Sequence, residues 1–343
     1  MSRKTKGSSS FLSNQKPNEL ILINPQDSTH VENMKAVSSI HPKDARLPAV
    51  QAVIVNWNGK EHLLECLASI EALDYPDSKL RIVVVDNGSR DGSQQTVIRQ
   101  HPRCALLENR KNLGYANAVN RGIQHGLASG AGYIWISNND VVVFPDTLRE
   151  LVNAGESDKS IGVIAPVVYA YGDPQKVSNA GYSINFWTGR MKRLRIGRDV
   201  FVNQENTACD VDSILGCSLL IKASVFPRIG VFKTIYNVYF EETDFNVRAR
   251  RAGFRVVLAK NAKVLHKDAA TMDLHLLWRA WLLLRNLFVF ECLNAGRIQL
   301  AVFLAYYFLV HLPQFIVRGS LYALRTKCSQ ARQMFRGARL MGQ

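Results

Sequence analysis

Apolar runs that end abruptly in polar loops recur through the first half of the chain. The run VQAVIV ends in the polar NWNG of 56–59, and the EHLLECLASIEAL segment that follows has apolar residues at helical spacing. LRIVVVDNGSRDGS repeats this pattern, with an apolar strand over 82–85, a loop over 86–93 and a helix that reaches about residue 101. The pattern therefore predicts successive units of strand, loop and helix.

Two further units follow. A strand at 105–107 precedes a helix over 116–127, and the run that starts at Tyr133 is the strand of the fourth unit. Because parallel neighbours need crossover helices, this alternation predicts an α/β fold with a doubly wound, mainly parallel sheet. Another strand is expected over 161–169, whereas the Gly-, Asn- and Arg-rich segment 171–206 breaks the alternation and predicts an irregular or antiparallel insert.

The stretch YIWISNNDVVV, residues 133–143, is expected to form a strand that places Asp140 in a cleft. Its aromatic and β-branched residues favour a buried strand, and ligands of open α/β sheets bind just beyond the carboxyl ends of the strands. A carboxylate in that place can hold a divalent cation. The alternative is that Asn-Asn-Asp is only turn chemistry.

Two more loops carry polar residues that suit a nucleotide. Asp86 follows an apolar strand, so its carboxylate can accept hydrogen bonds from a nucleobase or ribose, unless the N-G pair after it marks a hairpin turn. Asn112, Gly114 and Asn117 open the third helix, whose N-terminal amides favour a phosphate. Neither G-x-G-x-x-G nor the P-loop G-K-[ST] occurs at these loops, which argues against a dinucleotide oxidoreductase and a P-loop kinase.

The acidic stretch FEETDF contains three candidate general bases, Glu241, Glu242 and Asp244. One of them can draw a proton from a hydroxyl that attacks an electrophile, although acids in a first helical turn also stabilise the helix macrodipole. His266 ends another apolar strand. It is expected to be either a ligand of the same metal as Asp140 or a structural histidine.

The positive charge of the chain is concentrated in its last third. The apolar fraction of 47% and the charged fraction of 21% are ordinary for a globular protein. Lys and Arg number 43 against 28 Asp and Glu, and residues 248–343 alone hold sixteen basic and three acidic residues. Because those basic residues are interleaved with apolar helical stretches, the pattern favours an anionic membrane surface over nucleic acid.

Two apolar stretches, 276–290 and 298–317, predict helices near the carboxyl terminus. The second is long enough to span a bilayer, but its polar residues and proline favour helices that lie in the membrane interface. The alternatives are a buried helix pair and a homo-oligomer contact. Because residues 1–19 lack the apolar core of a signal peptide, we expect a peripheral protein on the cytoplasmic side of the plasma membrane.

Taken together and in order, these motifs resemble the family-2 glycosyltransferases with a GT-A-type fold, especially their rhamnosyltransferase-like members. The similarity spans about residues 50–285 and is carried by VIVNWNG, VVVDNGSRDGS, NLGYANAVNRGI, WISNNDVVV, GCSLLI, FEETDFNVRARRAGF and VLH. With the composition, it predicts a flexible extension over 1–46, a nucleotide-sugar-binding catalytic domain over 47–268, and a basic, apolar helical region over 269–343.

The resemblance implies a role for each matching residue. Asp140 corresponds to the last acid of the family's D-x-D signature and would bind Mg²⁺ or Mn²⁺ with assistance from His266. Glu242 would be the catalytic base, with Glu241 and Asp244 as alternatives. Contacts with the nucleotide sugar, or with the walls of its pocket, fall at Asn56, Asp86, Asn87, Asn112, Gly114, Asn117, Asn139, Gly216 and Cys217.

Two departures from the family pattern affect this assignment. The D-x-D signature is Asn138-Asn139-Asp140 here, so that metal binding would depend on donor phosphates. The base position, often Asp in the family, holds Glu in this chain.

The implied reaction is an inverting transfer from a nucleoside-diphosphate sugar to a hydroxyl of a lipid-linked glycan in cell-surface polysaccharide or cell-wall synthesis. dTDP-rhamnose is the first candidate donor and a UDP-sugar the next. One alternative is a catalytically silent nucleotide-sugar-binding scaffold in a membrane glycan-assembly complex. The other is an integral membrane polysaccharide synthase or flippase-like partner, for which a single span is too few.

Overall fold

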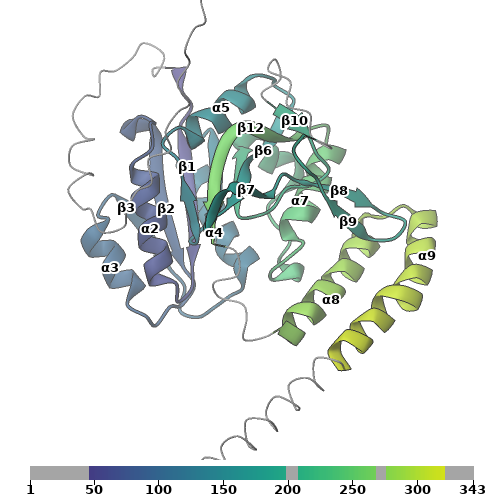
Figure 1. Cartoon of the computed structure of the whole chain (residues 1–343). Coiled ribbons are helices and arrows are strands. Elements are labelled where there is room, and N and C mark those ends of the chain that lie inside the picture. The colour runs from purple at the N-terminus through teal and green to yellow at the C-terminus, as the bar shows by residue number, and fades with distance from the viewer. Residues whose placement is uncertain (1–45, 198–207, 268–275, 321–343) are drawn as a thin grey trace, which may run out of the picture. The chain divides into compact units, whose positions relative to one another are not determined.

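The computed structural model describes residues 46–197, 208–267 and 276–320 (Figure 1). The expected extension over 1–46 therefore lies almost entirely outside the described residues. The strands are β1 Val50–Asn56, β2 Leu80–Asp86, β3 Cys104–Glu108, β4 Tyr133–Asn138, β5 Val141–Val143, β6 Ile161–Ala170, β7 Asp173–Asn179, β8 Tyr182–Asn185, β9 Arg190–Arg193, β10 Ala208–Asp210, β11 Ser218–Lys222 and β12 Arg255–His266. The α-helices are α2 Lys60–Glu71, α3 Ser93–Gln100, α4 Tyr115–Ala128, α5 Thr147–Glu156, α6 Phe226–Ile229, α7 Glu241–Arg251, α8 Leu276–Asn294 and α9 Arg297–Tyr306.

The described strands form one ten-stranded sheet and the separate β8–β9 hairpin. The main path through the sheet is β10-β12-β6-β11-β4-β1-β2-β3, with β5 paired to β12 and β7 to β6. Strands β1 to β4 pair in parallel, as do β6 and β12, so the prediction of a mainly parallel sheet is confirmed. The predicted antiparallel insert is also present, because β7 pairs antiparallel with β6 and β8 with β9.

Two features of the sheet position the site. The strand order reverses at β1, which has β2 on one side and β4 on the other, and ligands of open sheets bind in the crevice at such a switch point. On the far side of β4, the antiparallel β11 fills the place between β4 and β6. This strand, absent from the sequence prediction, brings the residues just before it close to the end of β4.

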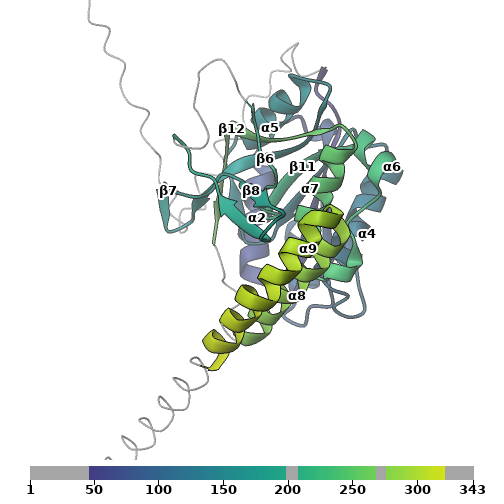
Figure 2. The ribbon, with the colours of Figure 1, turned by 90° about the vertical axis from the view of Figure 1, so that its right-hand side faces the viewer.

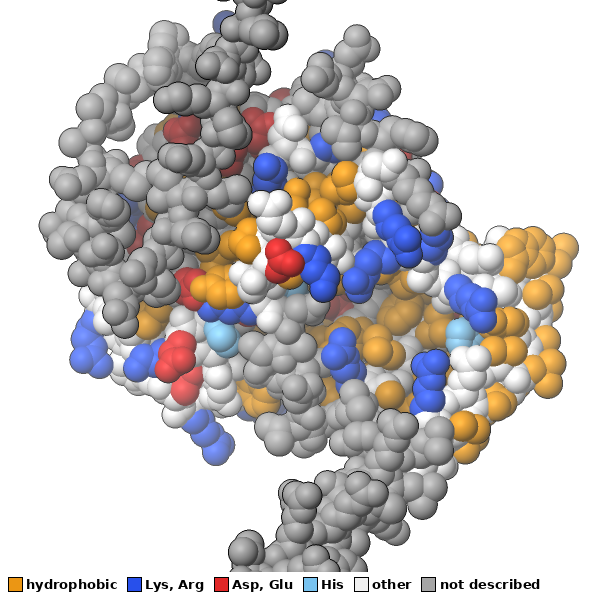
Figure 3. Space-filling model, viewed as in Figure 1, with side chains coloured by type: hydrophobic (Ala, Val, Ile, Leu, Met, Phe, Trp, Pro, Cys, Tyr) orange, Lys and Arg blue, Asp and Glu red, His pale blue; other side chains and the backbone are white. Residues whose placement is uncertain are grey.

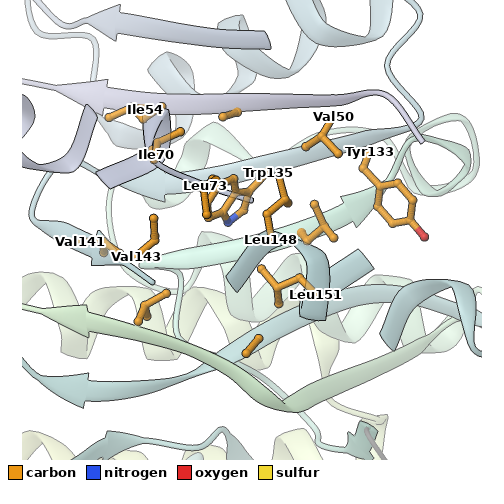
Figure 4. Close-up of a cluster of buried hydrophobic side chains, with 14 of the residues drawn as sticks. Val50, Ile54, Ile70, Leu73, Tyr133, Trp135, Val141, Val143, Leu148 and Leu151 are labelled. Atoms are coloured by element: carbon orange, nitrogen blue, oxygen red, sulfur yellow. The ribbon is translucent and has the colours of Figure 1, made fainter. Parts of the chain in front are cut away.

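Helices cover both faces of the sheet (Figures 1 and 2). One apolar cluster joins α2, α3 and α5 to one face, and a second joins α4, α6 and α7 to the other. Figure 4 shows Trp135 of β4 in the middle of the first cluster, between side chains of α2 and α5. Trp135 is fully buried and its Nε1–H donates to Ser218 Oγ of β11 at 3.0 Å, so the polar edge of the ring is satisfied inside the core.

The carboxyl-terminal helices α8 and α9 lie side by side, with α8 packed against α7 (Figures 1 and 2). Leu287 of α8 packs with Phe303 and with Tyr307, where α9 continues into a π-helical turn over Tyr307–His311. Among the described residues, the helical stretch Arg297–Ser320 is the one that is long and apolar enough, by length and composition, to cross a membrane. Most of its side chains are not buried.

Candidate active site

The carboxyl ends of β1 and β2 are joined by a closed hydrogen-bond network. Asn56 and Asp86 are register partners, and both are buried. The Asp86 carboxylate accepts hydrogen bonds from Asn56 Nδ2 at 3.1 Å, from the backbone N–H groups of Gly88 and Ser89, and from Gln94 Nε2 at 2.9 Å. Asp86 therefore holds the loop after β2 in shape, and its contact with a nucleoside stays a prediction.

Asn87 ties this loop to the one after β3. Its Nδ2 donates to Asn112 Oδ1 at 2.9 Å, and its Oδ1 accepts hydrogen bonds from Asn109 Nδ2 and the Leu113 N–H at 3.0 Å each. Asn112 Oδ1 also accepts the N–H of Gly114 at 2.9 Å. The structure thus brings the predicted residues Asn87, Asn112 and Gly114 together where α4 begins.

Gly114 begins α4 at a point where a side chain has no room. Its φ is +84°, and an added Cβ would overlap the side chain of Asn237, with only 1.6 Å to Oδ1. The Asn237 carbonyl oxygen accepts the N–H of Ala116 at 3.0 Å. The start of α4 is therefore fixed from outside by the chain that leads to α7. Asn117 is exposed and donates from Nδ2 to the Leu113 carbonyl oxygen at 2.9 Å.

Asn138 and Asn139 bind neighbouring segments through their amides. Asn139 Nδ2 donates to Asn56 Oδ1 at 2.8 Å, which ties the end of β4 to the end of β1 across the switch point. Asn138 Oδ1 accepts the Tyr115 hydroxyl at 2.8 Å, and its N–H donates to the carbonyl oxygen of the buried Cys217 at 2.9 Å. Asn138, where the family signature has its first acid, thus has a structural part in this chain.

Asp140 and His266 meet where β5 pairs with β12. His266 Nε2 lies 3.3 Å from Asp140 Oδ1, and both side chains are about nine-tenths buried. Burial would raise the pKa of Asp140, but its interaction with His266 outweighs that effect and lowers the pKa below its usual value. Asp140 is therefore an ionised carboxylate beside an imidazole.

This pair fits a divalent cation as part of its ligand set. Asp140 Oδ1 is buried and makes no hydrogen bond of ordinary geometry within the described chain, which leaves a lone pair for a cation. Carboxylate oxygen and imidazole nitrogen are both ligands of Mn²⁺. No three Asp, Glu, His or Cys side chains converge on one point in the described ranges. A cation bound here would complete its shell with oxygen ligands from outside the protein.

Glu242 lies against the backbone of Gly216. A Cβ added at Gly216 would lie 3.2 Å from Glu242 Cγ, so the absence of a side chain at Gly216 leaves room for Glu242. Burial raises the pKa of Glu242 to about 7, more than its backbone hydrogen bonds lower it. Its Oε2 is buried with no hydrogen-bond partner in the part of the chain that is described. An acid with such a pKa, and with a carboxylate oxygen that can still accept a hydrogen bond, suits proton abstraction near neutral pH.

Glu241 and Tyr115 complete the surroundings of this acid. Burial, and then the charge of Glu242, raise the pKa of Glu241 well above its usual value, so Glu242 is the acid of the pair that ionises first. Burial also raises the pKa of Tyr115, and the charges of Glu241, Glu242 and Asp140 add to that rise. The charges of the candidate bases and of the candidate metal ligand therefore all raise the pKa of one tyrosine, Tyr115, which lies near each of them.

Asp244 is used differently from its two acidic neighbours. Its Oδ1 accepts hydrogen bonds from Lys233 Nζ, Tyr236 Oη and Asn294 Nδ2, at 3.0, 3.2 and 3.0 Å, and its Oδ2 accepts from Arg248 Nε at 2.6 Å. The Asp244 side chain is fully buried, and although burial raises its pKa, these partners lower it overall. Asp244 joins α7 to α8, and it is not retained as a candidate base.

Several residues of this site were not predicted from the sequence. Tyr115 lies just before the predicted helix 116–127 and was given no role, although a tyrosine directly after N-L-G is a visible signal. Asn237 and Asn294 carry no local pattern that indicates their contacts with Gly114 and Asp244. Those contacts join segments more than forty residues apart, so only the folded chain reveals them.

The doubly wound sheet with its switch point at β1, and the acid pair in the first turn of α7, fit a glycosyltransferase with a GT-A-type fold. Residues 51–212 match the sequence profile of Glycosyl transferase family 2. The chain thus carries a family-2 glycosyltransferase domain and is rhamnosyltransferase-like in sequence. A solved mannosyltransferase from Pyrobaculum calidifontis, in complex with GDP-Man and Mn²⁺, shares the fold with a TM-score of 0.54, 19% identity and coverage of 86% of both chains.

Two curated relatives illustrate the sequence similarity. The N-acetylglucosaminyl-diphospho-decaprenol L-rhamnosyltransferase of Mycobacterium tuberculosis is 29% identical over 242 residues, which are 63% of this chain and 75% of the relative. The galactofuranosyltransferase GlfT1 of Mycolicibacterium smegmatis is 25% identical over 223 residues, which are 63% of this chain and 70% of the relative. Both relatives are sugar transferases, in line with the transferase assignment.

Proposed function

We propose that this chain transfers a sugar, with rhamnose the first candidate, from a nucleoside-diphosphate donor to a hydroxyl of a lipid-linked glycan, inverting the anomeric carbon. The carrying observation is that the charges of Glu242 and Asp140 both raise the pKa of Tyr115, so that a candidate base with a pKa of about 7 and a candidate metal ligand lie near the same tyrosine. The Mycobacterium tuberculosis relative is named for rhamnose and for a diphospho-decaprenol acceptor, which supports both choices.

The proposed reaction is one displacement. The acceptor oxygen attacks the anomeric carbon, its proton passes to Glu242, and the new glycosidic bond forms as the bond to the nucleoside diphosphate breaks. Gly216 leaves the space in which the Glu242 side chain lies, and the protonated Glu241 beside it spares the site a second negative charge. Attack from the side opposite the leaving group gives inversion.

The donor would bind along the switch point between β1 and β4. Asp140 and His266 would hold a divalent cation, which on binding neutralises charge on the donor diphosphate and eases its departure. Asn56, Asp86, Asn87, Asn112 and Gly114 would form the wall for the nucleoside, because they line the adjoining carboxyl ends of β1 to β3. The side chains of this wall are hydrogen-bonded to one another without ligand, which reduces the ordering cost of binding.

The α8–α9 pair would hold the enzyme on an anionic membrane surface from the cytoplasmic side. Trp278 and Trp281 are about half exposed, and Ile298 and Leu309 are exposed to a larger extent. Figure 3 shows hydrophobic side chains gathered over α9 with Lys and Arg side chains between that helix and the sheet. Trp in this setting is typical of membrane interfaces.

Contacts along the middle of the long apolar helix favour a lying over a spanning orientation. Arg190 of β9 stacks 5.3 Å from the Tyr306 ring centroid, and His311 Nε2 lies 2.8 Å from the Thr188 carbonyl oxygen. A helix held to the catalytic domain at its middle runs along that domain, so it is poorly placed to cross a bilayer there. Alkaline carbonate extraction of membranes should accordingly release the protein.

The test of the proposal compares Glu242→Gln with the unchanged enzyme. Transfer from dTDP-rhamnose to a polyprenyl-diphosphate-linked N-acetylglucosamine should fall by about 10³-fold or more, the upper range for loss of a general base. Thermal stabilisation by the donor with Mn²⁺ should stay the same, since Glu242 does not bind the nucleotide.

Two outcomes would contradict the proposal. Unchanged turnover in Glu242→Gln would remove this residue from the mechanism. No thermal stabilisation by any member of a panel of dTDP-, UDP- and GDP-sugars, with or without Mn²⁺, would contradict donor binding at this site, whereas donor stabilisation without transfer would favour the silent scaffold.

A further inference from the structure

The chain before α7 is strained. Residues 235–240, here called the 235–240 loop, contain three of the four non-glycine residues with positive φ in the described ranges: Asn237 at 63°, Tyr239 at 68° and Phe240 at 72°. Asn237, with ψ of −64°, is the centre of a γ-turn closed by the Val238 N–H and the Tyr236 carbonyl oxygen at 2.8 Å. This turn type is rare and strained, and such backbone persists only where its surroundings over-determine it.

The 235–240 loop contacts both the proposed donor side and the proposed acceptor side of the site. On the donor side, the Asn237 carbonyl oxygen accepts the N–H of Ala116 and its side chain covers Gly114. On the acceptor side, Phe240 is the N-cap residue of α7, so the next two residues are the acids Glu241 and Glu242. A shift of the loop would therefore move the base relative to the wall of the donor pocket.

A single buried side chain of α8 holds this loop. Asn286 is fully buried, and its Nδ2 lies 2.9 Å from the carbonyl oxygens of Tyr236, Val238 and Tyr239. Two amide hydrogens thus serve three carbonyl groups, of which that of Tyr236 also accepts the Val238 N–H of the γ-turn. Arg285 orients the amide, since its Nη1 donates to Asn286 Oδ1 at 2.7 Å and to the Ile235 carbonyl oxygen at 2.9 Å.

We infer that Asn286 is a positioning residue for sugar transfer, acting through the 235–240 loop on the placement of Glu242. The inference rests on the proposed role of Glu242. Asn286 touches neither of the acids, and its three acceptors lie on the loop that leads to them. A helix with an exposed apolar face, proposed to lie on the membrane, thereby takes part in assembling the catalytic site.

The decisive variant is Asn286→Leu in the full chain, which keeps the volume and removes the donors. With three carbonyl groups released, the loop relaxes and Glu242 loses its fixed, buried place. We expect kcat to fall about 10–100-fold, as for a catalytic group displaced by about an ångström. Because burial is what raises the pKa of Glu242, the acid limb of the kcat–pH profile should also move to lower pH. Asn286→Gln, which keeps the amide, should recover part of both.

The matched control is Leu287→Ala, next along the same helix. Leu287 packs against Phe303 and Tyr307, and Phe240 of the loop packs against the same cluster, so this change weakens apolar packing around the loop without removing a hydrogen bond to it. It should lower the melting temperature and leave the acid limb in place. If Leu287→Ala and Asn286→Leu give the same kinetic change, or if Asn286→Leu keeps the wild-type kcat and acid limb, Asn286 is merely structural and the inference is wrong.

A second variant keeps the test informative if Asn286→Leu does not fold. Asn237→Gly removes the backbone strain and the side chain over Gly114, so it should fold well while letting the loop move. Its kcat should fall with no loss of thermal stability, and an unchanged kcat would overturn the inference. The Glu242→Gln enzyme separates the two proposals. If that enzyme is active, the base assignment fails, whereas if it is inactive and the loop variants behave like wild type, only the role of Asn286 fails.

Discussion

Two regions of the site differ in how their buried polar atoms are satisfied. The nucleotide corner, made of Asn56, Asp86, Asn87 and Asn112, is a closed network in which each side chain has hydrogen-bond partners within the protein. The three candidate acids Asp140, Glu241 and Glu242, here called the acid cluster, each have one buried carboxylate oxygen without a hydrogen-bond partner among the described residues, although Asp140 Oδ1 lies 3.3 Å from His266 Nε2.

This difference indicates whether each region contributes mainly to stability or mainly to activity. Satisfied buried networks stabilise a unique fold, whereas buried polar atoms that lack partners destabilise it by about 1–3 kcal/mol each. The corner therefore stabilises the protein with or without ligand, and the acid cluster is kept at the expense of stability. Substitutions should cost mainly stability in the first region and mainly activity in the second.

The largest effect is expected at Asp140. Asp140→Ala should lower transfer by about 10³-fold, because charge stabilisation by a metal is worth several kcal/mol, and it should abolish the Mn²⁺-dependent part of donor stabilisation. Its melting temperature without ligand should fall less than in Asp86→Ala, because only the pairing with His266 is lost. Asn139→Ala is the neighbouring control, expected to keep the Mn²⁺ effect. Persistent Mn²⁺-dependent stabilisation in Asp140→Ala would remove this residue from the metal site.

The opposite result is expected at Asp86. Asp86→Ala removes the acceptor of four hydrogen bonds, so we expect urea unfolding to show a loss of about 2–4 kcal/mol. Asp86→Asn, which keeps one carbonyl oxygen, should lose less. If Asp86→Ala unfolds at the wild-type urea concentration yet no longer responds to donor, Asp86 is a ligand-binding residue alone, and the contrast between the two regions is wrong at this position.

The pH dependence of kcat distinguishes Glu242 from Glu241 within the acid cluster. A base must be deprotonated to act, so with a pKa of about 7 for Glu242 the rate should rise between pH 6 and 8 and level off above. Because Glu241 holds its proton more tightly, Glu241→Gln should leave this limb near pH 7. A limb that moves by more than about one pH unit in Glu241→Gln would mean that the two acids share the titration equally.

The smallest effect is expected at Glu291 of α8, a buried acid whose two carboxylate oxygens lack partners in the described chain. Burial raises its pKa to about 8. The folded state therefore binds more protons than the unfolded state between about pH 4.5 and 8, so this acid lowers stability as pH rises through that window. Glu291→Gln should stabilise the protein by about 1–3 kcal/mol at pH 8 and leave kcat unchanged. Loss of activity would instead extend the acid cluster to α8.

The sequence predicted those parts of the site that depend on strand ends. Asn56, Asp86 and Asp140 each follow an apolar run, and parallel pairing is enough to bring the ends of β1, β2 and β4 to one edge. The fold class followed from the same alternation. Partners of these residues were beyond prediction where they come from distant segments, as with His266 and Asp140, whose proximity depends on the pairing of β5 with β12.

Two features had no local signal at all. The short run SLLI at β11 gave no indication that it would lie antiparallel between β4 and β6. The three acids at 241–244 look equivalent in sequence, and Asp244 differs from the two glutamates because four side chains donate to it, from the segment before α7, from α7 itself and from α8. Hydrophobic patterning identifies which residues are buried, whereas long-range pairing decides which polar groups are satisfied.

The place of β11 in the sheet sets an order for folding. The strands up to β4 can pair as soon as they are synthesised, but the neighbour of β4 on its other side is β11, some eighty residues later in the chain. Until that segment emerges, one side of β4 is an open edge, and open hydrophobic edges are where chains pair wrongly with one another. Nascent chains stopped between residues 143 and 218 are therefore the ones most exposed to aggregation, and the insertion of β11 ends that exposure.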